Sequence, residues 1–122
     1  MAAPNLVNVS SIYGKTMGAA LGTTTTTSLL ANASGSNKLL KINSIIVSNV
    51  DGSNAADATI SWYNGTTDYR LARTVAVPAD STLVVIGKDA PIYLEENHSI
   101  RGGASAASDL EIVISYEELD DA

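Results

Sequence analysis

Residues 38–63 read KLLKINSIIVSNVDGSNAADATISWY, and this stretch decides the fold. Its two ends are rich in β-branched and aromatic residues, which favour strands. Between them lies a cluster of Asp, Gly, Ser and Asn, residue types that form turns because they tolerate left-handed backbone or bond to nearby main chain. We therefore expect two strands, joined either as a long hairpin or as a pair that crosses from one sheet to another.

Alternation along these two segments predicts the core. The residues that share the more apolar faces are Leu40, Ile42, Ile46 and Val50 on the first segment, and Ala58, Ile60 and Trp62 on the second. The opposite face of the first segment is also partly apolar, with Leu39, Ile45 and Val47. The first strand is therefore expected to be central and covered on both sides, or to touch another subunit.

The rest of the chain repeats this pattern of short apolar segments and turns. Asn64-Gly65 is a strong hairpin signal. The threonine run 23–27 is predicted to be a strand because it is β-branched, and the apolar run 82–87 is predicted to be a strand buried on both faces. About eight or nine short strands at regular spacing, without a helix, are typical of a single-domain antiparallel β-sandwich. The spacing leaves open whether the sandwich is jelly-roll-like or immunoglobulin-like.

The ends of the chain differ from this pattern. Residues 1–13 are interpreted as an N-terminal arm or edge strand, residues 14–117 as the sandwich domain, and residues 118–122 as an acidic C-terminal tail. Three glycines within residues 14–22 indicate a loop or an irregular strand there.

Composition excludes several classes of function. The net charge of −6 and the seven scattered Lys and Arg residues argue against a nucleic-acid surface. The absence of Cys removes disulfides, thiol nucleophiles and Cys-ligated zinc. The N-terminus has no signal-peptide pattern and no segment has the length of a membrane span, so we expect a product that is made and stays soluble in a cytoplasm. An aromatic fraction of only 5% indicates that packing against neighbouring copies contributes to stability.

Few residues offer chemistry. His98 follows Glu95 and Glu96 and could join them in a metal or acid-base site, but a charged turn explains the three without either. Asp51 and Asp57 border a loop with the composition of a calcium site, yet the spaced ligands of an EF-hand are missing. We expect no enzyme, no metal and no cofactor.

Two further side chains have alternative interpretations. Trp62 is in phase with the predicted core and is interpreted as its largest side chain, although stacking against a sugar is the alternative. Arg73 is predicted to point inward, because it shares its phase with Leu71, Val75 and Val77. A buried guanidinium needs a partner, so we expect an ion pair within the chain or a contact with another chain.

Four segments resemble small virion structural proteins of tailed bacteriophages, particularly those of cyanobacteria and other marine bacteria. They are LVNVSSIYGKT (6–16), KINSIIVSNVDGSNAADATISWY (41–63), VPADSTLVVIGKDAPIYLEENHSIR (77–101) and ASDLEIVISYEEL (107–119). The resemblance implies a capsid decoration (cement) protein that binds the outer surface of the expanded shell of major capsid protein. It also implies self-association as a dimer or trimer, synthesis in the host bacterial cytoplasm, and no contact with nucleic acid or membrane.

For such a role we expect the arm, residues 5–13, to add a strand to a sheet of another subunit. The residues expected to bind a partner are Leu6, Val7, Val9, Ile12, Tyr13 and Arg73. Two alternatives stay open. One is a tail, neck or fibre component of the particle, and the other is a carbohydrate-binding sandwich centred on Trp62 and Tyr63.

Overall fold

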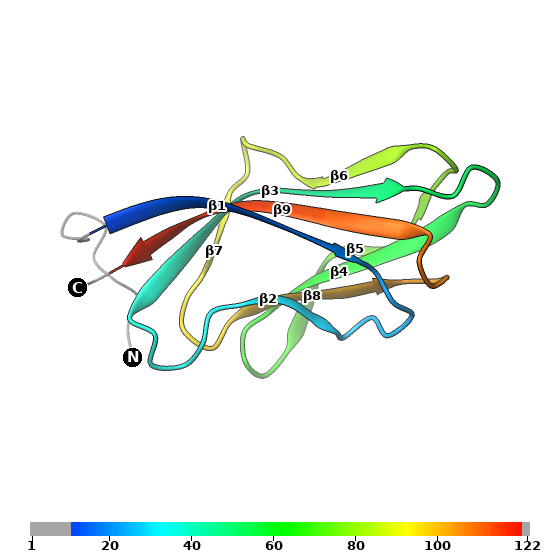
Figure 1. The fold of residues 1–122 in the computed structure, drawn as a ribbon. Helices are drawn as coiled ribbons and strands as arrows, with labels where there is room; N and C mark the ends of the chain where they lie inside the picture. Colours follow the sequence, from blue (N-terminus) through cyan, green and yellow to red (C-terminus); the bar gives the residue numbers. More distant parts are fainter. Residues whose placement is uncertain (1–10, 121–122) are drawn as a thin grey trace.

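The computed structural model describes residues 11–120 as nine strands in two antiparallel sheets (Figure 1). The first, sheet A, contains β1 (Ser11–Ala20), β9 (Leu110–Asp120), β3 (Lys38–Asn49) and β6 (Thr82–Ile86) in that order, with β7 (Ile92–Leu94) also paired to β3. The second, sheet B, contains β2 (Ser28–Ala31), β8 (Ser99–Ala104), β4 (Ala56–Tyr63) and β5 (Asp68–Val77). The predicted all-β sandwich is confirmed. The described residues form no helix, and so none that could span a membrane.

The strand order is that of a jelly roll. Consecutive strands β1, β2, β3 and β4 alternate between the two sheets, so the pair β3 and β4 crosses the sandwich instead of forming a hairpin. An immunoglobulin-like sandwich would place its first two strands side by side in one sheet, whereas here β1 and β2 lie in different sheets. The predicted hairpin at Asn64-Gly65 is present and joins β4 to β5 within sheet B. β6 and β7 lie one after the other along the same edge of β3.

A bulge in β3 decides which of its residues enter the core. Ile42 lies opposite Tyr116 of β9, but Ser44 lies opposite Ser115, so one extra residue interrupts the alternation. Beyond the bulge the apolar phase reverses, because one added residue moves every following side chain to the other face. Ile45 is fully buried, as is Val47.

The predicted core of this strand was therefore right only on one side of the bulge. Leu40 and Ile42 are buried as predicted, and so are Ala58 and Ile60 on β4. Two assignments were wrong, because Ile46 is half-buried on the outer face and Val50 is exposed; Ile45 and Val47, which were assigned to the opposite face, take their place in the core. The buried cluster that joins the two sheets consists of Leu21, Leu40, Ile42, Ile45, Val47, Ala56, Ala58, Ile60, Val77, Ile86, Leu94, Ile100, Ala104, Leu110, Ile112 and Ile114.

A second bulge turns Arg73 outward. Val75 lies opposite Ala58 and Ala72 opposite Ile60, so Arg73 and Thr74 together face a single residue of β4, Thr59. Thr74 has a left-handed φ of 46°, and its N–H donates a hydrogen bond of 3.0 Å to Thr59 Oγ1. The inward orientation predicted for Arg73 was wrong, because the bulge reverses the alternation between Val75 and Ala72.

Two other predictions were wrong, one of a strand and one of a strand's burial. The threonine run 23–27 is irregular: Thr27 bonds the carbonyl of Thr24 through its side-chain hydroxyl, at 3.0 Å. Threonine hydroxyls compete in this way with sheet hydrogen bonds. The apolar run 82–87 contributes β6, but β6 is an edge strand, and Val84 is 60% exposed.

The segment 11–20 is a regular strand despite Gly14 and Gly18. Its register with β9 runs through ten consecutive pairs without a shift, and this ladder outweighs the backbone freedom of the glycines. Residues 11–13 therefore belong to β1, and residues 118–120 belong to β9, so the sandwich extends past the boundaries expected at 13 and 117. Residues 1–10 and 121–122, including Leu6, Val7 and Val9, lie outside the described part.

The bulge at Thr74 generates a first prediction. Replacing Thr59 by Val removes the hydroxyl that accepts the Thr74 N–H while keeping the volume. We expect T59V to lower the free energy of unfolding by about 1–2 kcal/mol, the usual result of leaving a donor unpaired. Urea denaturation measures this, with T82V as the control because the Thr82 hydroxyl is exposed. An equal loss in both variants, or in neither, would contradict the role given to Thr59.

Candidate interaction surfaces

The turn after β7 uses its polar groups for structure. Glu96 is buried, and its carboxylate accepts hydrogen bonds from the N–H groups of Gly35 at 2.8 Å and Asn37 at 3.0 Å. His98 Nδ1 accepts one from the N–H of Glu95 at 3.1 Å. Residues 11–120 contain no group of three His, Cys, Asp or Glu side chains that could hold a metal ion. This arrangement closes a turn through hydrogen bonds to backbone N–H groups.

The loop between β3 and β4 is likewise held by its own side chains. The Asn49 side-chain oxygen accepts from the Asp51 N–H, and Asp51 accepts from the Ser53 N–H, each at 2.8 Å. The hydrogen bond from Ser53, followed by that from the Asn54 side chain, holds the pKa of the Asp51 carboxyl below its usual value. Asp51 is therefore engaged in shaping the loop that crosses from one sheet to the other.

Three of the four sheet edges carry features that discourage strand pairing. β2 has four residues and a register shift, and β5 has two shifts and the exposed cations Arg70 and Arg73. β6 and β7 are short, and Pro91 directly precedes β7. Short strands, bulges, charges and prolines are the usual devices that protect an edge. These three edges, formed by β2, by β5 and by β6 with β7, are thus guarded against the addition of another strand.

The edge formed by β1 is different. It is ten residues long and has no shift, and no other strand of the described region lies beyond it (Figure 1). Ile12 is 58% exposed and Tyr13 50% exposed. A long, regular, partly apolar edge of this kind is a template for strand addition.

The only charged residue of β1 does not guard this edge. Lys15 Nζ lies 3.2 Å from one carboxylate oxygen of Glu118, and Lys38 Nζ lies 3.2 Å from the other. Glu118 has a side chain that is only 13% exposed. Burial raises the pKa of Glu118, but the hydrogen bonds and charges of the two lysines outweigh it, so the pKa is lowered overall. Lys15 is thus held against its own sheet by an ion pair, although the group of two lysines and one carboxylate keeps a net positive charge.

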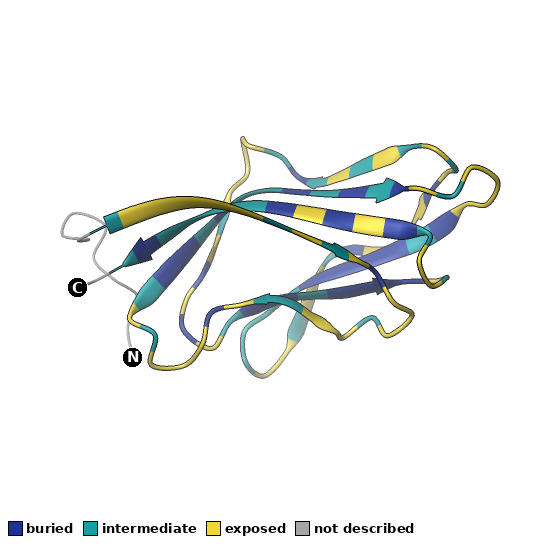
Figure 2. Ribbon diagram, in the orientation of Figure 1, coloured by how far each residue is buried: buried dark blue, intermediate teal, exposed yellow. Residues whose placement is uncertain are grey.

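Sheet A presents an uncharged band on its outer face. Figure 2 shows burial alternating along β9, where every second residue turns away from the core. The registers place Gly18, Val113, Ile46 and Val84 side by side in one row across four strands, and Thr16, Ser115 and Ser44 in the next. These seven residues define the band: Thr16, Gly18, Ser44, Ile46, Val84, Val113 and Ser115. None is charged, and most are small, so a flat partner could approach closely.

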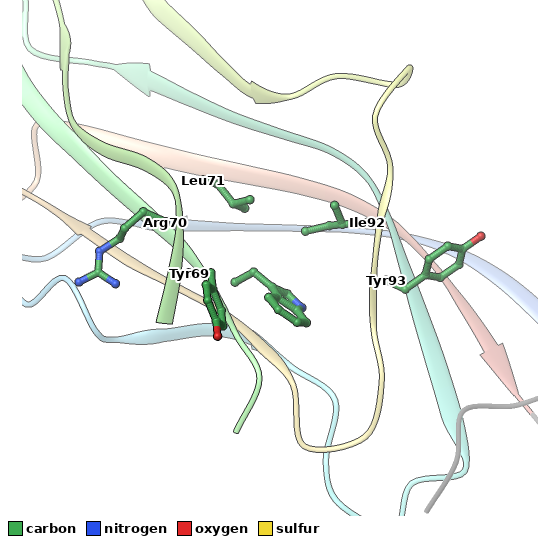
Figure 3. Close-up of a pocket in the computed structure, with 6 residues that line it drawn as sticks. Tyr69, Arg70, Leu71, Ile92 and Tyr93 are labelled. Carbon is green, nitrogen blue, oxygen red and sulfur yellow. The ribbon is translucent and has the colours of Figure 1, made fainter. Parts of the chain in front are cut away.

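A second surface is a hollow of about 350 Å³ between β4, β5 and β7. It is lined by Trp62, Tyr69, Arg70, Leu71, Ile92 and Tyr93. In Figure 3, Leu71 and Ile92 lie at its middle, while Arg70 and Tyr93 extend away on opposite sides. The hollow is apolar at its centre and polar only at its margins.

Trp62 lies at the margin of the core and not at its centre. Trp62 is partly buried, its ring centroid lies 5.8 Å from that of Tyr69, and it makes a T-shaped contact with the His98 ring, whose centroid is 5.1 Å away. Tyr63 is on the other face of β4, where Arg101 lies 4.0 Å above its ring. The pairing of Trp62 with Tyr63 considered from the sequence therefore does not form, and Tyr69 takes the place of Tyr63.

The residues predicted to bind a partner do not form one site. Ile12 and Tyr13 are exposed at the β1 edge of sheet A, whereas Arg73 is exposed on β5, at the far edge of sheet B. Arg73 makes no ion pair with any residue of the described range, and because it is exposed its guanidinium needs no partner. The uncharged band was not predicted. Its one sequence signal is Val113, an apolar residue in the solvent-facing phase of β9.

No protein-family model matches this sequence, and no curated protein matches it. Two solved structures show a distant similarity in fold, and both are of a pentameric capsid protein isolated from metagenomic phage sequences. Each is 17% identical with a TM-score of 0.38, and each match covers 96% of this chain and 68% or 64% of the other. Likeness this distant transfers no function to the chain.

The ion group around Glu118 generates the second prediction. Because its pKa is lowered in the folded state, ionised Glu118 adds stability above the unfolded pKa of about 4.3, and this is lost as pH falls through the folded pKa. We expect E118Q to lower the free energy of unfolding by about 1 kcal/mol at pH 7 and by progressively less below about pH 4. Urea denaturation across this range measures it.

The control for this experiment is E111Q, an exposed glutamate on the same strand. Its effect should stay within about 0.5 kcal/mol at every pH. A pH-independent loss in E118Q would contradict the assigned role of the carboxylate charge.

Proposed function

We propose that this chain is a structural virion protein of a tailed bacteriophage, a decoration protein that binds the outer surface of the expanded shell of major capsid protein. The sequence resemblance to small phage virion proteins motivates the proposal. The observation that carries it is the uncharged band, because a surface of small, uncharged side chains drawn from four strands suits contact with another protein surface more than with a small substrate.

The size of this face bears on the strength of binding. The band spans four strands about 4.8 Å apart and two rows of side chains along them, so it measures about 15 Å by 13 Å, or roughly 200 Å² per chain. A stable interface takes about 800 Å² from each partner. One copy thus offers a modest contact, which suits a protein whose binding is reinforced by repetition on a lattice.

The N-terminal arm is the second contact in this proposal. Leu6, Val7 and Val9 precede β1 and supply the alternating apolar side chains of a strand that adds to a capsid subunit. Ile12 and Tyr13 belong to β1, so an informative truncation removes residues 2–10 and leaves the paired strand intact. We propose that this truncation folds and binds shells more weakly.

The third prediction tests the band directly. The double variant V84E/V113E places two charges on it, and since burying unpaired charge is costly we expect affinity for expanded shells to fall about tenfold or more. Co-sedimentation with expanded shells that lack the protein measures this, with the truncation of residues 2–10 in the same assay. V50E is the matched control, because Val50 is 52% exposed on the loop after β3, away from the band. Equal binding by V84E/V113E and wild type would overturn this surface as the contact.

The hollow at Trp62 favours a second candidate, a carbohydrate-binding module. Aromatic rings flanked by hydroxyl and guanidinium groups suit the apolar faces and hydroxyls of a sugar. Trp62 is the single tryptophan, so its fluorescence reports on this hollow alone. Saturable quenching by oligosaccharides, lost in Y69A, would support this function. Unchanged emission at millimolar sugar would exclude it in favour of the structural role.

A further inference from the structure

We propose that two copies of this chain pair through their β1 edges, antiparallel about a two-fold axis, so that the two A sheets become one continuous sheet. This inference goes beyond the proposed function, because it concerns the isolated protein and does not require a capsid. It begins from the contrast among the edges: three are guarded, and the β1 edge is long, regular and free of proline.

The phase of hydrogen bonding along β1 shows which groups are free. The Leu21 N–H donates to the Leu110 carbonyl at 2.9 Å, directly after the last pair of the ladder. In an antiparallel pair, alternate residues exchange both hydrogen bonds with the partner strand. The odd-numbered residues of β1 thus bond to β9, and the even-numbered ones, from Ile12 to Ala20, direct their N–H and C=O groups outward.

The side chains favour one register. Residues directly opposite in an antiparallel pair share a face, so a two-fold axis must pass through a residue. With the axis at Thr16, Ile12 lies opposite Ala20 of the second copy and Tyr13 opposite Ala19 of the second copy. Each large exposed side chain of β1 then meets a small one.

The same register separates like charges. Lys15 lies opposite Met17 of the second copy, whereas an axis through Lys15 would place two lysines face to face. The outward backbone groups of Thr16 fall at the axis and bond to their symmetry equivalents. A second copy is therefore a self-complementary occupant of this edge, which a strand of unrelated sequence would match only by chance.

The dimer also enlarges the surface available for docking. Two uncharged bands on one continuous sheet present roughly 400 Å², twice the area of a single copy, although this is still less than the ~800 Å² that a stable interface takes from each partner. The strands run in opposite directions, so the two N-terminal ends of β1 point to opposite ends of the joined sheet. The dimer thus places the two uncharged bands on the same face of one continuous sheet.

Because hydrogen bonds to β9 alternate along β1, one substitution can weaken the dimer contact and leave the pairing with β9 intact. T16P removes an outward N–H and leaves the bonds to β9 in place, and proline is tolerated on an edge strand in such a position. Sedimentation equilibrium should show a dimer for the wild type and a dissociation constant about 30-fold higher or more for T16P, since the two central hydrogen bonds are lost. Thermal unfolding confirms that T16P is folded. A monomeric wild type, or an undiminished T16P dimer, would overturn the proposal.

A second experiment tests the register without weakening the fold. The chain has no cysteine, so Y13C/A19C introduces the only thiols. In the Thr16-centred register these residues form a non-hydrogen-bonded pair about 4.5 Å apart between Cα atoms, close enough for a disulfide. We expect a covalent dimer on mild oxidation of Y13C/A19C but not of Y13C or A19C alone. A monomeric double variant, or an equally cross-linked single variant, would rule this register out.

Discussion

The antiparallel pairing of β3 with β9 is the interaction on which the rest of the structure depends. β3 pairs on one side with β9 and on the other with β6 and β7, so it joins both halves of sheet A. Its bulge between Ile42 and Ser44 determines which apolar residues enter the core. Ile45 and Val47 fill the space between the sheets, and Ile46, which an unbroken strand would have turned inward, joins the outer band. A single extra residue thus produces both the core and the candidate docking surface.

The sequence supported the fold class because most strands carry their own signals. Alternation located β9, Asn64-Gly65 located the β4 to β5 hairpin, and the Asp-Gly-Ser-Asn cluster located the connection between β3 and β4. The bulges left no such signal. Three consecutive apolar residues, Ile45 to Val47, fit either phase, and Thr74 adopts a left-handed backbone without the glycine that would have marked it.

The candidate surfaces were predictable only where one segment makes them. Ile12 and Tyr13 were identified because they lie together on β1. The uncharged band draws residues from four strands that are far apart in the sequence, so it depends on strand order, which alternation leaves open. The same holds for the hollow, where Tyr69 joins Trp62 across the β4 to β5 pair. Local sequence patterns thus predict individual strands, whereas a surface made by several strands depends on how those strands are arranged in the fold.

The described part of the chain has an uncharged band on the outer face of sheet A, a long regular edge beside it, and polar side chains engaged in turns. These features suit a protein that acts by repeated contact with a larger surface. The most direct measurement is quantitative mass spectrometry of purified particles, with heads and tails separated and the major capsid protein as the internal standard. The account predicts that this chain is found with the heads, in a fixed and substantial ratio to the major capsid protein. Recovery only with tails, or absence from both fractions, would contradict it.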